Sequence, residues 1–482
     1  MAVLEGLKPE RVFYYFEEIC NIPHGSGNTK EISDYLVKFA KDHKLPCVQD
    51  DSNNVIICKS ASEGYEDSQP VILQGHMDMV CEKKDSSSHD FEKDGLDLFV
   101  EDEFIRARDT TLGGDDGIAV AYALAILEDD TLAHPPLEVV LTVDEEIGLL
   151  GAGALDFSQL HAKTMINLDS EEEGIFYISC AGGMTATSEL PVRFQKESGI
   201  ACDICVKGLM GGHSGAEIHK NGANAHILMA RIWFALKENM QVRLVRLDGG
   251  SKETAITRTC GCTLLVHPDE VELLKCEAAR LEEEFQKEYA GIEEHLEISV
   301  TIGDETTDLV VHPTDMEKII FYLINIPNGV QKMSGVLPGL VETSNNIGVL
   351  ELTEDSLVAS SAPRSSLASA RDYISGKIGY LTEMLGGEYT VSGIYPAWEY
   401  RADSRLQSVM SEVYEKMYGK KPSIQALHAG LECGIFYENI DDLDCVSMGP
   451  DIKGIHTVEE RLSIPSVKRN YEYLLEVLKE LK

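Results

Sequence analysis

Acidic and imidazole side chains stand at four places in the first 170 residues where an apolar run ends or a helix begins. The four places are His76 with Asp78, Asp115 with Asp116, Glu145 with Glu146, and Asp169. Imidazole and carboxylate groups are the usual ligands of divalent first-row metal ions. In a paired carboxylate, one member can bind metal while the other acts as a base. The spacing therefore predicts a catalytic metal centre.

Each of these motifs alone also fits a structural role, such as a solvated turn or a helix cap. Competing catalytic motifs are absent, because the chain has no HExxH, no GxSxG and no P-loop sequence. The run Gly151-Ala152-Gly153 follows a predicted strand, but Asp156 stands where a dinucleotide fingerprint needs its third glycine. The acidic and imidazole motifs therefore remain the candidates for chemistry, although each alone is a modest signal.

The elements that must position these residues alternate between strand and helix. Residues 70–74, 137–143 and 165–168 are apolar runs typical of buried strands, and residues 28–43 and 116–127 are typical of helices. In open α/β sheets, binding sites lie at the carboxyl ends of strands. Three predicted strand ends carry His, Asp or Glu, which favours an α/β fold with its site at one sheet edge.

The pattern of elements changes near residue 187 and again near residue 397. The sequence predicts a catalytic domain whose first part spans residues 1–186 and whose second part spans residues 398–482. Residues 187–397 lie between these parts and read as two α/β units in tandem, without sequence identity between them.

Composition limits the classes of partner. The chain has 482 residues, with 42 Lys and Arg against 82 Asp and Glu, so its formal net charge is −40. This charge excludes nucleic acid and anionic membranes as partners. The longest apolar run, residues 118–127, is ten residues long, whereas a membrane span needs about 20. Residues 1–13 lack a signal-peptide core, so we expect a cytoplasmic protein with reduced cysteines.

In the order HxD, GGDDG, DEE and NLD, the motifs resemble those of the co-catalytic two-zinc peptidases, the family that includes aminoacylase and carnosinase. Within it, longer stretches resemble the bacterial aminoacyl-histidine dipeptidases over about residues 10–480. These stretches are VILQGHMDMV, TTLGGDDGIA, LEVVLTVDEEIG, INLDSEEEG, GGHSGAEIHKNGANA, VETSNNIGVL, HAGLECG and MGPDIKGIHTVEE. The resemblance implies a mixed-sheet α/β/α catalytic domain with an inserted α/β lid domain.

The resemblance also implies two divalent metal ions per chain, zinc in the first place and manganese or cobalt as alternatives. The implied ligands are His76, Asp115 and Asp169 for one ion, and Asp115, Glu146 and His456 for the other. Asp78 would orient His76, and Glu145 would be the general base toward a bridging, metal-activated water. A cis peptide bond is expected at Asp115–Asp116.

Two residues of the inserted segment match the family's substrate-binding positions. His213 is implied to stabilise the oxyanion, with a turn histidine as the alternative. Arg364 is implied to bind the substrate's terminal carboxylate, with a surface ion pair as the alternative. The chain departs from the family where Thr254 and Thr257 replace an asparagine and a proline.

The activity that the resemblance implies is metal-dependent hydrolysis of dipeptides, with Xaa-His and carnosine-like substrates among the candidates. An N-acyl amino acid deacylase on the same fold remains an alternative, and so does a non-catalytic peptide-binding protein. The expected partner is a small peptide substrate. A monomer and a homodimer formed through the lid are both open.

Overall fold

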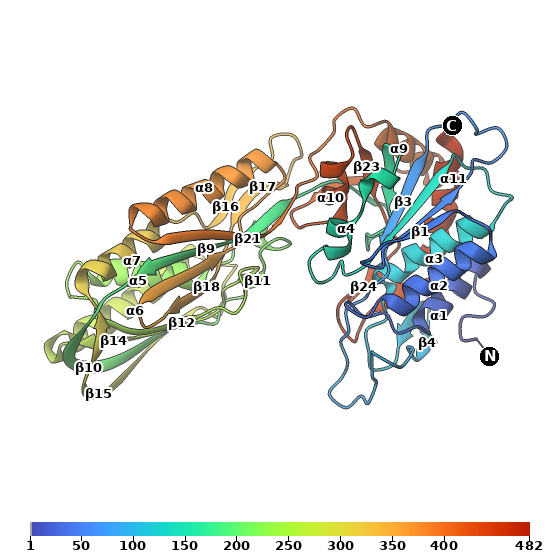
Figure 1. Ribbon diagram of the computed structural model, residues 1–482. Helices are drawn as coiled ribbons and strands as arrows, with labels where there is room; N and C mark the ends of the chain where they lie inside the picture. Colours follow the sequence, from blue (N-terminus) through green and yellow to red (C-terminus); the bar gives the residue numbers. More distant parts are fainter. Residues whose placement is uncertain (1) are drawn as a thin grey trace. The chain divides into compact units, whose positions relative to one another are not determined.

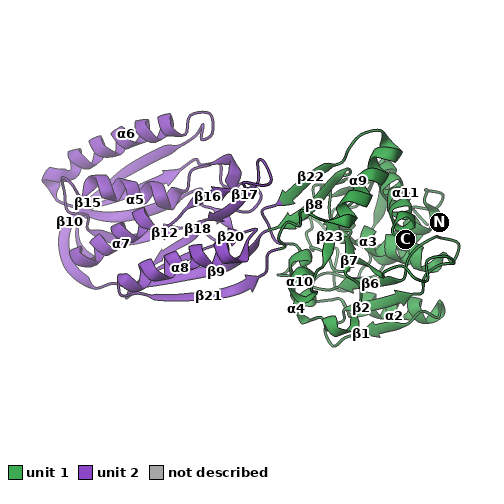
Figure 2. Ribbon diagram, turned by 90° about the horizontal axis from the view of Figure 1, so that it is seen from above, with its two compact units in different colours: residues 1–180, 398–426, 431–482 green, residues 181–397, 427–430 purple. Residues whose placement is uncertain are grey.

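The structure is a computed structural model that describes residues 2–482. The chain divides into two compact units, which Figure 2 shows in different colours. Unit 1 comprises residues 1–180, 398–426 and 431–482, and unit 2 comprises residues 181–397 and 427–430. The chain therefore leaves unit 1 after Cys180 and returns to it at Trp398.

Unit 1 is built on an eight-stranded mixed sheet (Figure 1). Its strands in spatial order are β1 (Cys47–Gln49), β2 (Val55–Lys59), β6 (Leu137–Thr142), β3 (Val71–His76), β7 (Thr164–Asn167), β23 (Asp444–Ser447), β8 (Ile175–Cys180) and β22 (Ser423–Leu427). The strand β3 runs parallel to β6 and β7, and β23 runs parallel to β7. The carboxyl ends of these strands therefore meet at one edge.

Helices surround this sheet. They are α1 (Glu10–Cys20), α2 (Lys30–Asp42), α3 (Gly114–Glu128), α4 (Leu150–Ala154), α9 (Arg405–Tyr418), α10 (Glu432–Asn439) and α11 (Ile464–Glu480). The helix α3 packs between β3 and α1, and its residues from Gly114 to Leu127 are all buried. A helix that is apolar on every side needs this interior position. The predicted strands and helices of this region are thus confirmed, and with them the α/β class.

A small sheet holds the segment that contains His456. It consists of β24 (Ile452–Lys453), β25 (Arg461–Ser463), β5 (Phe104–Ala107) and β4 (Leu98–Glu101). The strands β24 and β25 form a hairpin, and β25 pairs with β5. The turn of this hairpin, residues 454–460, is therefore anchored at both ends.

Unit 2 is built on one eleven-stranded sheet. Its path runs β15 (Glu297–Val311), β10 (Phe194–Lys207), β14 (Cys260–Val266), β12 (Leu244–Gly249), β18 (Ile347–Leu352), β19 (Ser356–Ser361), β9 (Gly182–Pro191), β20 (Arg364–Ser365), β17 (Val341–Asn345) and β16 (Gly329–Met333), while β21 (Glu388–Tyr395) pairs with β9. The strands of the two expected α/β units therefore belong to a single sheet.

Four helices pack on the sheet of unit 2, and Figure 1 shows them on one side of it. They are α5 (Ala225–Leu236), α6 (Val271–Glu288), α7 (Pro313–Asn325) and α8 (Ala368–Met384). Their buried residues share one hydrophobic core with the sheet, and Trp233, Phe285 and Tyr322 are its large members. A separate ribbon of β11 (Gly212–His213) and β13 (Ala255–Ile256) carries His213. Among residues 2–482, no helix has the length and apolar character needed to cross a membrane.

Candidate metal centre

The carboxyl ends of three parallel strands bring together the first set of predicted site residues. His76 is the last residue of β3, Asp169 follows β7, and the pair Glu145-Glu146 follows β6. The strand register aligns His76 with Thr142 of β6, and Gln74 with Asn167 of β7. Because these strands point the same way, the side chains after them gather at one edge of the sheet.

Asp115 contributes from the start of α3. Its backbone is not helical, and the peptide bond between Asp115 and Asp116 is cis, as the resemblance implied. One carboxylate oxygen of Asp115 lies 3.2 Å from Nε2 of His76, and the other lies 3.2 Å from Nε2 of His456. Asp115 therefore faces both histidines with different oxygens, which is the arrangement that a bridging ligand needs.

His456 enters this cluster from the turn between β24 and β25. Its φ of 58° lies in the left-handed region, and its Nε2 lies 2.9 Å from Oε1 of Glu146. Among residues 2–482, three groups have ligand atoms within 4.8 Å of one another. They are His76 with Asp116 and Asp169, His76 with Glu145 and Glu146, and Asp115 with Glu146 and His456. All five residues implied as ligands thus belong to one cluster in unit 1.

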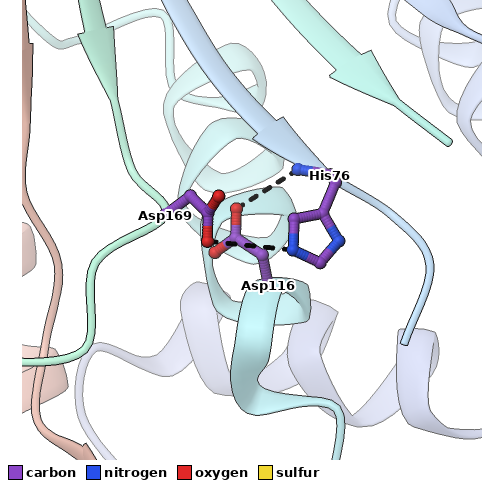
Figure 3. Close-up of side chains that lie close together, drawn as sticks. All are labelled: His76, Asp116 and Asp169. Carbon is purple, nitrogen blue, oxygen red and sulfur yellow. Dashed lines mark hydrogen bonds and ion pairs between the residues drawn. The ribbon is translucent and has the colours of Figure 1, made fainter. Parts of the chain in front are cut away.

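Asp116 was not among the implied ligands, although it lies in the cluster. Figure 3 shows its side chain beside His76 and Asp169. Its Oδ2 accepts a hydrogen bond of 3.2 Å from the backbone N–H of His76, whereas Nε2 of His76 lies 3.7 Å from Oδ1 of Asp169. The acidic pair in the sequence was the signal for this residue, and a helix-capping role was the competing explanation.

Positive charge nearby would stabilise the ionised forms of the buried carboxyl groups in the cluster. Burial raises the pKa of both Asp116 and Asp169 well above the usual value. Burial also raises the pKa of Glu145 to about 8, and the carboxylates of Glu432, Glu146 and Asp115 add to the rise against an opposing effect of His76. Buried like charges disfavour ionisation. Divalent cations would relieve this repulsion, so the donor set fits a pair of such ions.

Asp115 differs from these carboxyl groups. Burial acts to raise its pKa, but hydrogen bonds with His456 and His76 outweigh burial and lower it. The hydrogen bonds of His456 with Asp115 and Glu146 raise the pKa of that imidazole to about 10. Asp115 is therefore the carboxylate of the cluster whose ionised form the two imidazoles stabilise.

Asp78 connects His76 to the loop that carries Glu145. Its Oδ1 lies 3.4 Å from Nδ1 of His76 and accepts a hydrogen bond of 3.1 Å from the backbone N–H of Glu145. Its Oδ2 accepts a hydrogen bond of 2.8 Å from the hydroxyl of Ser26. Partners of this kind fix the orientation of a metal-binding imidazole. The backbone carbonyl of Asp78 lies nearer, 3.0 Å from Nδ1 of His76, and the orienting role of the Asp78 carboxylate stays a prediction.

A buried polar network lies beneath the site and was not predicted. Gln74 Oε1 accepts a hydrogen bond of 2.5 Å from Asn167, and Gln74 Nε2 donates one of 2.5 Å to Glu432. The same Glu432 oxygen accepts a hydrogen bond of 2.6 Å from Thr142. The network thus joins the ends of β7, β3 and β6, which precede the acidic and imidazole residues. The sequence signal for this network was the presence of polar residues inside otherwise apolar strands.

His213 lies in unit 2, on the ribbon strand β11. Its Nδ1 accepts a hydrogen bond of 3.2 Å from the backbone N–H of Ala216, and its own backbone N–H donates one of 2.9 Å to Glu217. Burial and the nearby Arg364 lower the pKa of His213. The imidazole is therefore held in a turn, and Arg364 lies close enough to influence its charge.

Arg364 lies on β20 and is only 5% exposed. Its Nη1 donates a hydrogen bond of 2.6 Å to the hydroxyl of Tyr395. The alternative of a surface ion pair is therefore wrong, because the side chain is not at the surface. His428 belongs to the same neighbourhood, since burial and then Arg364 lower its pKa to about 3. His428 bonds to the hydroxyl of Ser344 at 2.7 Å and was a missed candidate.

The two departures from the family sequence have different surroundings. The carbonyl of Thr254 accepts a hydrogen bond of 2.8 Å from the backbone N–H of Ser214, next to His213. Thr257 is buried, and its hydroxyl lies 3.2 Å from the carbonyl oxygens of both Ile347 and Gly348. Thr257 therefore serves the packing of unit 2, while Thr254 borders the turn of His213.

A cluster of imidazole and carboxylate groups at the edge of a mixed α/β sheet is typical of a metal-dependent hydrolase. Residues 72–480 match the peptidase family M20/M25/M40. The chain belongs to this family. It is 38% identical over 484 residues to the cytosol non-specific dipeptidase of Escherichia coli (strain K12), with 100% of this chain and 99% of that protein covered. The predictions of a peptidase and of its family are confirmed.

Solved structures agree with this assignment. The chain resembles the crystal structure of aminoacylhistidine dipeptidase from Vibrio alginolyticus at 34% identity and a TM-score of 0.91, covering 99% of this chain and 97% of that chain. Aminopeptidase PepT from Bacillus cereus shares the fold at 16% identity and a TM-score of 0.56, covering 98% of this chain and 99% of that chain. The predicted two-part fold class is thus confirmed.

Proposed function

We propose that the protein is a metal-dependent dipeptidase that acts in the cytoplasm on dipeptides with a free carboxylate, with Xaa-His dipeptides among its substrates. The observation that carries the proposal is the position of Asp115, whose two oxygens face His76 and His456 at 3.2 Å each. Full-length similarity to proteins named as dipeptidases supports the substrate class. The free state of all twelve cysteines suits a reducing compartment.

In this proposal five residues hold two divalent ions, and zinc is the metal we expect first. One of the five residues contacts both ions. His76 and Asp169 bind one ion, Glu146 and His456 bind the other, and Asp115 binds both. Such ions supply Lewis acidity, which polarises the peptide carbonyl and makes water more acidic. The surplus of buried carboxyl groups over imidazoles in the cluster supports this assignment.

Glu145 is the general base in this proposal. It accepts a proton from the attacking water and donates it to the amine that leaves. Its place among the candidate groups supports the role, because it lies within 4.8 Å of ligand atoms of both His76 and Glu146. A base in that place borders both halves of the centre. Asp78 holds the backbone of Glu145 and the ring of His76 at once.

Unit 2 supplies substrate recognition in this proposal. Arg364 binds the terminal carboxylate through its forked guanidinium, and His213 stabilises the oxyanion. One buried atom supports the role of this neighbourhood: Nε of Arg364 has no hydrogen-bond partner in the described part of the chain. Buried polar atoms are rarely left unpaired. A bound carboxylate would accept the hydrogen bond that the Nε–H of Arg364 can donate. The monomer and the homodimer through the lid stay alternatives.

A substrate panel tests the proposal. The purified protein, stripped of metal and then supplied with zinc, manganese or cobalt, is assayed on dipeptides that include Gly-His and carnosine, and on N-acetyl amino acids. Release of free amino acids from dipeptides, abolished by a chelator and restored by metal, is expected. Hydrolysis of the acetylated substrates alone would indicate a deacylase, and no hydrolysis in any metal would overturn the proposal.

A further inference from the structure

Glu460 is a buried carboxylate to which neither the sequence analysis nor the proposed function gives a role. It is 3% exposed and lies in the turn that carries His456. Its Oε2 accepts backbone hydrogen bonds from Leu112 at 2.7 Å and Gly113 at 3.1 Å. Its Oε1 accepts others from Gly114 at 2.8 Å and Asp115 at 3.4 Å. Four consecutive N–H groups thus converge on one carboxylate.

The loop at residues 112–115 is shaped around this carboxylate. Gly113 has a φ of 67°, in the left-handed region that favours glycine. A Cβ atom added to Gly114 would lie 3.3 Å from Oε1 of Glu460, so a side chain there would press on the carboxylate. Successive N–H groups in such a turn form a natural binding site for an anion. In this protein the anion comes from the chain itself.

Glu460 is also bonded within the turn that carries His456. The backbone N–H of Glu460 donates a hydrogen bond of 3.1 Å to the carbonyl of Thr457, and the hydroxyl of Thr457 donates one of 2.7 Å to the carbonyl of Gly454. These bonds tie Glu460 to the turn in which His456 stands. Glu460 therefore connects two segments whose site residues, Asp115 and His456, are 341 positions apart in the chain.

We propose that Glu460 is a positioning residue that fixes Asp115 relative to His456, and so sets the affinity of the ion held by Asp115, Glu146 and His456. The inference rests on the proposed function only in that this cluster binds divalent metal. The carboxylate acts through the backbone of residues 112–115 and does not itself bind the ion. Its carboxyl group suits the task, because two oxygens can accept hydrogen bonds from four donors at once.

Titration of the metal-free chain with cobalt(II), followed by visible absorption, tests the inference without any substrate. The variant Glu460→Gln keeps the shape of the side chain, but its NH₂ group meets two backbone donors that need an acceptor. We expect the ion at His456 to bind at least about tenfold more weakly, which is about 1.4 kcal/mol. In the dipeptidase assay kcat should fall while KM stays near the wild-type value.

The neighbouring residue offers a matched control. Glu459 is exposed, and its carboxylate lies 2.5 Å from Nη2 of Arg106. Glu459→Gln removes one negative charge from the same turn, so it should bind cobalt with wild-type affinity. A merely structural role for Glu460 would lower the unfolding temperature of the metal-free chain and leave cobalt affinity unchanged. Unchanged affinity in Glu460→Gln therefore overturns the inference.

A second variant decides the matter if Glu460→Gln does not fold. Glu460→Asp keeps the charge but shortens the reach by one methylene. Weakened binding of one of two cobalt ions supports the inference, and wild-type affinity overturns it. The wild-type chain distinguishes failure of the proposed function from failure of this inference. A wild-type chain that binds no cobalt overturns the metal centre and the inference together, whereas wild-type binding without dipeptide hydrolysis leaves the inference to stand on its titration.

Discussion

The metal centre of unit 1 and the neighbourhood of Arg364 in unit 2 differ in how their polar groups are satisfied. In unit 1, His76, Asp115 and His456 face one another, and Asp78 holds the ring of His76 from behind. In unit 2, Arg364 is buried with its Nε left unpaired in the described residues. The side chains of the first site are thus held by one another. The second contains a polar group that a ligand would complete.

This difference follows from where each site lies in its fold. The site of unit 1 stands on the ends of β3, β6 and β7, and β3 pairs with both of the other strands. The candidates of unit 2 lie on two-residue strands, His213 on β11 and Arg364 on β20. Rigid central strands suit ligands that must hold fixed distances, whereas short strands and turns suit recognition of varied substrates.

Of the substitutions that test this difference, the loss of Asp115 should have the largest effect on metal content and activity. Asp115→Ala removes the one carboxylate that faces both histidines, so both ions should be lost and dipeptidase activity should fall to the background rate. Elemental analysis of the dialysed protein measures the ions per chain. Asp130→Ala is the control, because that side chain is 94% exposed and lies 3.6 Å from Lys59. Two retained ions in Asp115→Ala would refute the bridging assignment.

Glu145→Gln should separate catalysis from metal binding. The amide keeps the size of the side chain but cannot accept a proton from water, so kcat should fall by about 10²- to 10⁴-fold. The metal content should stay at the wild-type value, because Glu145 is the base and not a ligand in the proposed arrangement. Stopped assays at saturating Gly-His measure kcat. A variant that turns over normally, or that loses metal, would contradict this role.

Arg364→Ala should disturb recognition and leave the metal centre intact. A hydrogen bond to a charged group contributes about 1.5–3 kcal/mol, so kcat/KM on a dipeptide should fall by roughly ten- to a hundredfold. On the matching dipeptide amide, which has no terminal carboxylate, wild type and variant should perform alike. Arg364→Lys keeps the charge without the fork and should recover only part of the loss. Equal losses on acid and amide would show that Arg364 does not read the carboxylate.

The sequence predicted the metal centre better than the parts that support it. His76, Glu146 and Asp169 were visible because apolar runs end beside them, and Asp115 because it stands where a helix begins. His456 came from resemblance alone, since no local pattern joins it to residues 287 positions earlier in the chain. Glu432 and Glu460 were missed because their partners are backbone and polar groups distant in sequence, and only the folded chain brings these together.

The architecture shows the same limit. The parallel strands of unit 1 were predicted because each is a continuous apolar run, as strands buried on both faces tend to be. The small sheet that anchors His456 was missed, since β24 and β25 have two and three residues and show no periodicity. Unit 2 was read as two α/β units, whereas β9 pairs with β19, β20 and β21 and joins all strands into one sheet.

The smallest predicted effect concerns stability and would show that unit 2 is held together without metal. Asp315 on α7 is 2% exposed and receives hydrogen bonds from Arg193 at Nε, 2.8 Å, and Nη2, 3.0 Å. These bonds lower the pKa of Asp315 to about 2. The carboxylate in the unfolded chain has a pKa of about 3.9, so its stabilising effect is complete above about pH 4 and is lost as the pH falls toward about 2.

Asp315→Asn should therefore lower the free energy of unfolding at about pH 7 by about 1–2 kcal/mol, a value reduced for the exposure of Arg193. The difference between variant and wild type should shrink at about pH 3, because the carboxyl of the unfolded wild-type chain is then mostly protonated, which stabilises the unfolded state. Urea unfolding at both pH values, on metal-free and metal-loaded protein, measures this. Glu317→Gln is the control on the same helix, since its pair with Lys237 is more exposed and should contribute at most about 1 kcal/mol. A loss that depends on metal, or one equal at both pH values, would mean that the Arg193–Asp315 pair does not stabilise unit 2 in this way.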